Sequence, residues 1–554
     1  DLNATLNINC RLTGGAGFQL YSWNGAAGTI ALKHKNNDFL GNICLNTAGT
    51  LGAVKFSNPG STDSSLGAGV RIRFNNNNMG GPILKYIGPG ETSNRRLELN
   101  SHSKIEQAGT GHLILSSPVN IVAGGGLTLT LQGSSAGTAE ISGTVSNGTA
   151  GVAVTKDGTG TWTLSAPNLF NSALTVNNGT LRLTQTNVYA AATTVNAGTL
   201  SLAGPAGAVP NTSGITLNNG GTLMIGNTPA DNHPDRVRNA AAVTLNGGTV
   251  RFSHSAGAAS YSEKLGTVAV ASGANTIVAS QAAAGQRSAL TLSGLTRTAG
   301  LVNFVGTGLG ASARNRIFID GQADGLIGPW ATVNGTALAA YSSTLGVYAA
   351  GEASYTDIAA RGPSTIQDGA ASQVRINSEG EAGPITLGAT TTTIGSLTQN
   401  TATEAVVDTA EKTLRATRVT VPAGKAGVTL GVATGEGTLS ASTAGGGLIL
   451  ESGGTSGGLT VNAVIANNTS ASALTKAGSG TVTLAAPNTF SGATALNEGA
   501  LVLADAAALQ NSTLTLGLSG TPVFSSAVAG NAFTLGGLTG TRELALVKSG
   551  RAHV

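Results

Sequence analysis

Residues 154–164 read VTKDGTGTWTL, and residues 474–484 read LTKAGSGTVTL. After two further residues both copies continue as Pro-Asn-x-Phe, at 167–170 and 487–490. They then run on without a gap through VNNGTL and LNEGAL. An alignment without gaps over about thirty residues does not arise from composition alone, so it marks a repeated structural unit.

A shorter phrase recurs between the two long copies. It consists of an apolar residue and Asn, a turn containing Gly, and then Thr with alternating apolar residues, as in VNAGTL (195–200), LNNGGTL (217–223) and LNGGTV (245–250). A divergent copy of the long repeat occupies residues 28–51. The asparagines of successive phrases follow at roughly twenty to thirty residues, which is the length of one rung in a parallel solenoid.

The alternation within each phrase predicts which side chains face inward. In Thr180–Leu183 the two leucines fall on one face of a strand, and Thr and Arg fall on the other. One rung cannot bury its apolar face alone, but rungs stacked about 4.8 Å apart complete their backbone hydrogen bonds and close a core. Asn and Thr at matching turn positions are expected to stack as side-chain ladders. We therefore predict an all-β fold, a single right-handed parallel β-helix (β-solenoid) with irregular loop insertions.

Composition agrees with many short strands and tight turns. The chain has 554 residues with 81 glycines, 10% charged and 4% aromatic residues. Disordered chains are usually poor in apolar residues and highly charged, whereas this chain is 40% hydrophobic with a formal charge of only +4. An antiparallel sandwich also has short strands at regular spacing, but it does not explain the long repeats. The chain has no dense Lys/Arg run of the kind that would indicate nucleic-acid binding. It also has no apolar run of about 18–20 residues, which a transmembrane segment would require.

The repeats suggest a domain organisation along the chain. We predict N-terminal rungs at 1–136 with a possible terminal pairing strand at 1–12, a repeat-rich β-helix at 137–310, less regular insertion-bearing rungs at 311–364, and a C-terminal repeat-rich β-helix at 365–554 that ends mid-repeat.

The long repeats resemble the autotransporter-associated β-strand repeat, also called the passenger-associated transport repeat. The resemblance rests on the Lys-x-Gly-x-Gly strand that begins at Lys156, the Asn168-x-Phe170 step and the Asn-x-Gly-x-Leu turn. The phrases at Ile327–Gly335 and Tyr86–Arg96 also resemble phrases of large bacterial surface proteins. The resemblance implies export to the outer surface of a Gram-negative-type bacterium and says little about function.

Three functions follow from this interpretation, in order of preference. The first is a non-enzymatic extracellular solenoid whose copies join end to end into a surface fibre or matrix, because an uncapped rung presents unpaired backbone groups. The second is a monomeric autotransporter-like passenger or surface adhesin that binds host or matrix glycans, with the segment from about 311 to 364 as its ligand surface. The third is a polysaccharide-acting enzyme, which would need clustered carboxylates on one face.

The two cysteines are the candidate site residues. Alternation places Cys10 on the inner face of its strand, and alignment with the long repeat places Cys44 on the outer face. Three states stay open: an intrachain disulfide between Cys10 and Cys44, a disulfide between subunits, and free thiols. An extracellular setting favours oxidation.

Other motifs predict no catalytic, metal or cofactor site. Gly454–Gly458 matches G-x-S-x-G, but the strand–turn–helix that this motif requires is absent. Asp231–Arg236 contains alternating Asp, His and Asp, and its proline favours a solvated loop between rungs. The three tryptophans, Trp23, Trp162 and Trp330, lie far apart in the sequence. No cofactor is expected.

Overall fold

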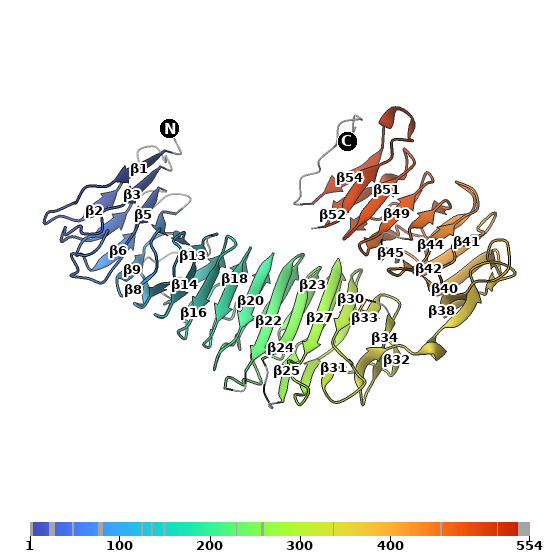
Figure 1. Ribbon diagram of the computed structural model, residues 1–554, viewed down its shortest axis with the longest axis horizontal. Coiled ribbons are helices and arrows are strands. Elements are labelled where there is room, and N and C mark those ends of the chain that lie inside the picture. Colours follow the sequence, from blue (N-terminus) through green and yellow to red (C-terminus); the bar gives the residue numbers. More distant parts are fainter. Residues whose placement is uncertain are drawn as a thin grey trace. The chain divides into compact units, whose positions relative to one another are not determined.

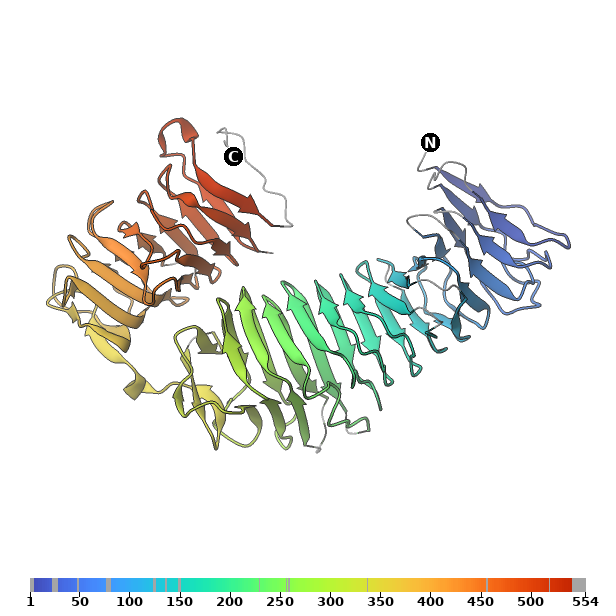
Figure 2. The same cartoon turned by 180° about the vertical axis from the view of Figure 1, so that it is seen from behind.

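Short strands make up nearly all the regular structure of the protein. The computed structural model describes residues 4–21, 28–46, 49–75, 81–122, 126–134, 137–147, 151–228, 230–255, 257, 260–335, 337–454, 457–517 and 519–540. Its helices are the single turns η1 (Glu352–Ser354) and η2 (Ala529–Asn531). The chain forms two compact units: the first comprises Asp1–Ala269, Thr276–Thr296 and Ser312–Gly321, and the second Val270–Asn275, Arg297–Ala311 and Gln322–Val554 (Figure 1, Figure 2).

The first unit has three faces, each a sheet in which strands follow one another in chain order. One sheet contains β1 (Thr5–Ile8), β3 (Thr29–Leu32), β5 (Thr50–Ala53), β7 (Ile83–Tyr86), β10 (Ser103–Gln107), β13 (Leu127–Gln132), β15 (Val152–Lys156), β17 (Leu174–Val176), β19 (Thr193–Val195), β21 (Gly214–Asn218) and β23 (Ala242–Asn246). The second contains β8 (Glu91–Ser93), β11 (Leu113–Leu115), β14 (Thr138–Ile141), β16 (Thr161–Leu164), β18 (Thr180–Leu183), β20 (Gly198–Leu202), β22 (Gly221–Asn227), β24 (Thr249–His254) and β27 (Ala274–Ser280). The third face is made by β2 (Phe18–Leu20), β4 (Ile43–Leu45), β6 (Arg71–Phe74), β9 (Arg96–Leu99) and β12 (Val119–Ile121), and later by β25 (Tyr261–Leu265), β28 (Ser288–Leu292) and β31 (Asn315–Ile319).

The second unit continues the same construction over its C-terminal part. Its larger sheet contains β36 (Thr356–Ala359), β38 (Gly369–Ser378), β40 (Thr391–Gln399), β42 (Thr413–Val421), β44 (Thr438–Ala441), β45 (Gly447–Ser452), β47 (Val464–Ile465), β48 (Ala473–Ala477), β50 (Thr494–Leu496), β52 (Leu509–Leu516) and β54 (Leu535–Thr539). The facing sheet contains β41 (Ala405–Val407), β43 (Val428–Leu430), β46 (Leu459–Val461), β49 (Thr481–Leu484), β51 (Ala500–Leu503) and β53 (Thr521–Phe524), and β37 (Thr365–Ile366) pairs with β39 (Thr386–Leu387).

Parallel pairing from rung to rung confirms the predicted fold class. Strands separated by one rung pair in parallel and in register, so that Leu181 lies opposite Trp162 on one side and Leu200 on the other. The chain therefore passes from face to face and returns to the first face one rung later. The protein is a right-handed parallel β-solenoid.

A short antiparallel segment interrupts this pattern within the predicted irregular rungs. Strand β34 (Ala337–Ser342) pairs in antiparallel fashion with β32 (Gly325–Leu326), β33 (Ala331–Val333) and β35 (Gly346–Ala349), and β33 pairs in parallel with β30 (Leu301–Val305). The remaining strands, β26 (Val268–Ser272) and β29 (Leu295–Arg297), contain residues of both units, as β27 does.

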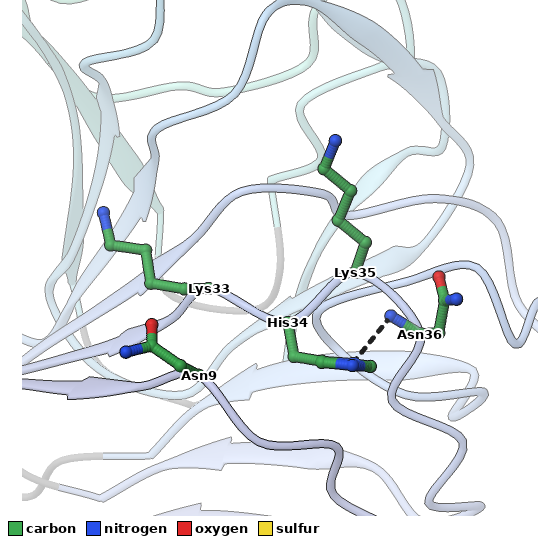
Figure 3. A pocket seen from close by; sticks show the side chains of 5 residues that line it. All are labelled: Asn9, Lys33, His34, Lys35 and Asn36. Carbon is green, nitrogen blue, oxygen red and sulfur yellow. Dashed lines mark hydrogen bonds between the residues drawn. The ribbon is translucent and has the colours of Figure 1, made fainter.

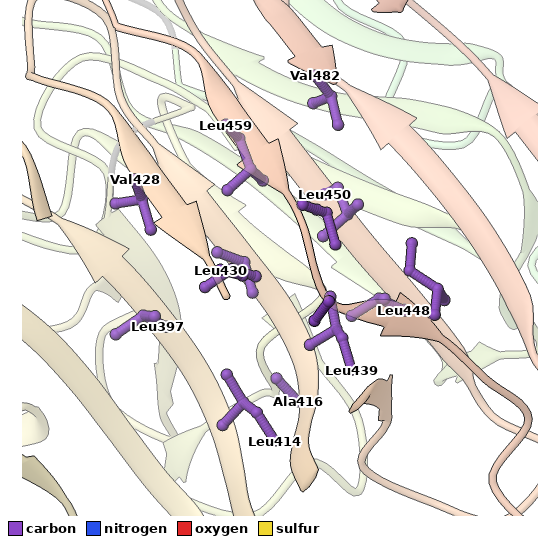
Figure 4. Packing of buried hydrophobic residues seen from close by; sticks show 14 of the residues in the cluster. Leu397, Leu414, Ala416, Val428, Leu430, Leu439, Leu448, Leu450, Leu459 and Val482 are labelled. Carbon is purple, nitrogen blue, oxygen red and sulfur yellow. The ribbon is translucent and has the colours of Figure 1, made fainter. Parts of the chain in front are cut away.

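Alternation along the strands produces the core that the sequence predicts. Leu181 and Leu183 are fully buried, whereas Arg182 between them is exposed. In the second unit, leucine, valine and isoleucine from both facing sheets meet in one continuous cluster (Figure 4), which includes Leu397, Leu414, Val428, Leu430, Leu439, Leu450, Leu459 and Val482. Each rung thus buries its apolar residues against the rungs above and below it.

The predicted asparagine ladder is present at one corner of the first unit. Asn196 donates to Asn177 (2.8 Å), Asn218 to Asn196 (2.7 Å) and Asn246 to Asn218 (3.0 Å), across sequence separations of 19, 22 and 28 residues. Rung length therefore varies while the corner stays in register, because extra residues are accommodated in loops away from the ladder.

A buried lysine closes the turn in each long repeat. The Nζ of Lys156 donates to the carbonyl oxygens of Asp157 (2.7 Å), Gly158 (2.6 Å) and Asn178 (3.2 Å). The Nζ of Lys476 donates to those of Ala477 (2.8 Å), Gly478 (2.6 Å) and Glu498 (2.9 Å). Burial lowers the pKa of both side chains to about 8. The lysine thus satisfies carbonyls of its own turn and of the next rung, which explains its place in the motif.

The glycine of the following turn is required by the same close contact. Gly179 has a φ of 64°, and a Cβ there would lie 2.5 Å from the carbonyl oxygens of Gly158 and Gly160 and 2.8 Å from the Nζ of Lys156. A larger residue would push the rungs apart at the point where the lysine joins them.

The Pro-Asn-x-Phe step, at 167–170, lies in the connection between β16 and β17. The amide of Asn168 accepts from the backbone N–H of Val145 (2.9 Å) and donates to the carbonyl of Ala166 (2.8 Å). Phe170 is fully buried and stacks on Tyr189 of the next rung at 5.0 Å between ring centroids. Asn488 and Phe490 are buried in the same way in the second copy.

We predict that Lys476→Met destabilises its rung by about 1–3 kcal/mol, because three carbonyls lose their donor in a site that water does not reach. Hydrogen exchange of the Gly480 and Ala500 amides, which bond the adjacent rungs, measures this change. Lys425→Met is the matched control, since among the described residues Lys425 donates to one carbonyl, that of Asn400. Equal effects of the two substitutions would contradict a closing role for Lys476.

Candidate functional site

The two cysteines lie on the outside of the solenoid. Cys44, in β4, is half-buried between the buried Ile43 and Leu45, on the outer face as predicted. The predicted inward orientation of Cys10 is wrong, because β1 ends at Ile8 and Cys10 is exposed in the segment that follows. Both thiols are free in the structure. The intrachain and intersubunit disulfides stay predictions.

We expect a maleimide reagent to modify Cys10 faster than Cys44 in the folded protein, because the first thiol is exposed and the second is half-buried. Mass spectrometry of quenched samples measures both rates, and denaturant should make them equal. Resistance of both thiols until a reductant is added would show a disulfide instead, and non-reducing gels would then separate intrachain from intersubunit bonding.

The segment Asp231–Arg236 is a loop, as predicted, but its last residue has a role that the sequence does not reveal. Arg236 is fully buried. Its guanidinium donates to the carbonyls of Gly207 (2.7 Å), Gly204 (2.7 Å) and Asp231 (3.0 Å) and to the amide oxygen of Asn227 (2.9 Å). The guanidinium therefore fastens this loop to the preceding rungs. Across the described ranges no three His, Cys, Asp or Glu side chains are grouped to hold a metal.

A buried carboxyl group accompanies Arg236. Glu263, in β25, is only 2% exposed and accepts from the backbone N–H groups of Arg236 and Val237, each at 3.1 Å. Burial raises the pKa of Glu263 to about 8. Nearby, His254 stacks on Tyr261 at 4.2 Å between ring centroids, and burial lowers its pKa to about 4. These groups are enclosed by β24, β25 and β28, so they stabilise the corner and do not face a substrate.

We predict that the corner loses stability as the pH rises from 6.5 towards 8. The folded-state pKa of Glu263 lies above its unfolded value of 4.5, so its stabilisation is complete below pH 4.5 and is lost as the pH rises through about 8. His254 is neutral in both states above its unfolded pKa of 6.5 and adds nothing in this window. Hydrogen exchange of the β25 amides should show the loss in the wild type and not in Glu263→Gln. If exchange of the β25 amides depended on pH in the same way in both proteins, the role assigned to Glu263 would be wrong.

Two of the three tryptophans lie among the described residues, and Trp330 is half-buried with the guanidinium of Arg297 5.5 Å from its ring centroid. Trp162 is buried and donates to the carbonyl of Gln132 (3.0 Å), so it is a core residue. Trp23 and the Ser456 of the G-x-S-x-G pattern lie outside the described residues. Within the predicted ligand surface, Glu352 and Asp357 both bind the guanidinium of Arg375, which holds the pKa of each carboxyl below its usual value.

One hollow lies between two successive rungs near β1 and β3. Its volume is about 370 Å³, and it is lined by Asn9, Lys33, His34, Lys35 and Asn36 (Figure 3). We call it the basic hollow. The backbone N–H of Lys33 donates to the carbonyl of Ile8 (2.9 Å) at one end, and the backbone N–H of Leu12 donates to the side chain of Asn37 (2.8 Å) at the other. Between these two bonds the chain segments diverge and leave the hollow open.

Asn37 fixes the loop that carries the cations. It is fully buried, and its amide donates to the carbonyl of Ser65 at 2.8 Å. The side chains of Lys33 and Lys35 extend to one side of the loop (Figure 3), while the ring of His34 accepts the backbone N–H of Asn36 at 3.2 Å. Sequence reasoning missed this site because Lys33-His34-Lys35 is too short to stand out as a basic run.

The two long repeats and the first short phrase match a known family. Residues 154–183, 178–202 and 474–503 match the passenger-associated-transport-repeat. The chain carries passenger-associated transport repeats. In the structure these matches coincide with the lysine-closed turns at Lys156 and Lys476 and with the beginning of the asparagine ladder.

Similarity to a curated protein extends far beyond the repeats. The chain is 29% identical over 597 aligned positions to the protein named "Adhesin BmaC autotransporter" of Brucella suis biovar 1 (strain 1330). The alignment covers 96% of this chain and 16% of the length of that protein. No solved structure matches. No helix among the described residues has the length and apolar character needed to cross a bilayer.

Proposed function

We propose that the chain is part of the exported, surface-exposed portion of an autotransporter-type adhesin of a Gram-negative-type bacterium. The observation that carries the proposal is the agreement between structure and family: two of the three matched repeats contain a rung closed by a buried lysine, one in each compact unit. The similarity to an autotransporter adhesin over 96% of the chain supports the same assignment.

The proposed role of the solenoid is mechanical and adhesive, not enzymatic. Hydrolysis of glycosidic bonds requires two carboxyl groups placed on opposite sides of one bond. Two outward carboxylates on neighbouring strands of the first unit instead face cations: Glu98 contacts Arg73 at 2.8 Å, and Glu106 contacts Lys85 at 2.8 Å. Such pairs neutralise opposite charges on neighbouring rungs. The outer faces of the solenoid are then suited to contact a ligand along their length.

We expect the chain to reach the cell surface when it is placed between a signal sequence and the translocator of an autotransporter in a laboratory Gram-negative strain. Added protease should remove it from intact cells, and the cells should adhere more strongly to surfaces coated with extracellular matrix. Cells displaying an unrelated passenger of the same length are the control. Display without any gain in adhesion would contradict the adhesive role, and retention inside the cell would contradict the export assignment.

End-to-end assembly into a fibre stays a prediction of the sequence, and electron microscopy of the purified protein tests it. Separate particles over a wide concentration range agree with an adhesive passenger. Filaments with a regular axial repeat would replace the monomeric passenger with a fibre subunit.

A further inference from the structure

We propose that the basic hollow binds an acidic sugar unit, with Lys33 and Lys35 holding its carboxylate or sulfate group. This deepens the adhesive role proposed above by assigning a ligand class to one site of the chain. The assignment follows from three properties of the hollow: its fixed walls, its uncompensated charge and its size.

The walls are fixed before any ligand arrives. Backbone and side-chain hydrogen bonds at Ile8–Lys33 and Leu12–Asn37 tie the two rungs together on both sides of the opening. Asp38 adds a third tie through its backbone N–H to the carbonyl of Leu12 (3.1 Å). These ties hold the backbone of the site in place, so the entropy lost on binding comes mainly from ordering the exposed side chains of Lys33 and Lys35.

The charge of the hollow is positive and uncompensated. Its lining contains two lysines and no carboxylate. In the part of the chain that the structure describes, neither Lys33 nor Lys35 forms an ion pair. Two neighbouring cations do have partners, because Arg11 pairs with Asp38 and Lys55 pairs with Asp63. The two lysines of the hollow are therefore the ammonium groups that an external anion can reach, and charge-assisted hydrogen bonds are the strong ones.

The size and the remaining polar groups favour a sugar over a bare anion. The hollow has a volume of about 370 Å³ and is largely open to solvent, so a sugar ring would lie across it with part of its hydroxyl groups still in water. The side-chain amides of Asn9 and Asn36 can donate to and accept from hydroxyl groups. His34 uses Nδ1 to accept the Asn36 N–H, which leaves Nε2 as the nitrogen that can carry the ring N–H and donate. Two cations without an adjoining basic stripe or aromatic platform do not match a nucleic-acid strand.

Calorimetry on the purified full chain, at low ionic strength, tests the proposal with defined probes. An oligogalacturonate hexamer presents carboxylates, a chondroitin sulfate hexasaccharide presents sulfates as well, maltohexaose is neutral, and sodium sulfate is a bare anion. We expect both acidic sugars to bind, the better of the two identifying the acidic group. We expect maltohexaose and sulfate to bind at least about tenfold more weakly. Because display and cell adhesion are not involved, failure here is distinguishable from failure of the export assignment.

Two paired variants locate the site. Lys33→Gln/Lys35→Gln should weaken the acidic probes at least about tenfold, whereas Lys104→Gln/Lys264→Gln removes the same charge elsewhere and should leave binding unchanged. Because Lys33 and Lys35 are exposed, the first variant should keep the wild-type circular dichroism. Acetylation of lysines, read by mass spectrometry, should show protection of Lys33 and Lys35 by the bound probe.

Several results would overturn the proposal. Equal affinity of the two paired variants would place binding elsewhere. Failure of every acidic probe at millimolar concentration would exclude the site, and equal binding of sodium sulfate or maltohexaose would exclude the acidic sugar as its ligand class.

Discussion

The parallel backbone ladder between successive rungs is the constraint on which the rest of the structure depends. Outside the antiparallel segment at β32–β35, the strands within the stack obtain their hydrogen bonds from the rungs before and after them. Each corner must therefore recur at the same place even though the rungs differ in length. The asparagine ladder shows how this is achieved, since Asn177, Asn196 and Asn218 remain bonded across separations of 19 and 22 residues. Extra residues extend loops, as at Asp231–Arg236, and leave the ladder intact.

A second requirement follows from the first, because a closed stack of turns buries backbone carbonyls at its corners. The protein satisfies them with its own inward polar side chains. Lys156 and Lys476 do so in the long repeats, and Gln107 does so in a divergent rung, donating to the carbonyl of Gly111 (2.6 Å) and accepting from the N–H of Gly109 (3.0 Å). Gln399 has the same role in the second unit, where it donates to Thr403 at 2.8 Å. The charge of the lysine is thus secondary to its capacity to donate three hydrogen bonds.

Periodicity carried most of the information about the fold, and it failed where a residue acts outside the repeat. The fold class, the inward leucines and the asparagine ladder follow from alternation and spacing, which are local properties. Cys10 was misplaced because alternation was extended past the end of β1, and the chain leaves the strand at Ile8. Arg236 and the basic hollow depend on contacts between loops of different rungs. No regular spacing encodes such contacts, so the candidate binding site became visible only in three dimensions.

Burial of the lysines also limits where trypsin can cleave the folded chain. Trypsin must take a lysine side chain into its specificity pocket, and those of Lys156 and Lys476 are fully enclosed and hydrogen-bonded within their own rungs. Cleavage after either residue can therefore occur only when that rung has opened. Trypsin cleavage at these two positions, one in each compact unit, would therefore report local opening of each unit separately.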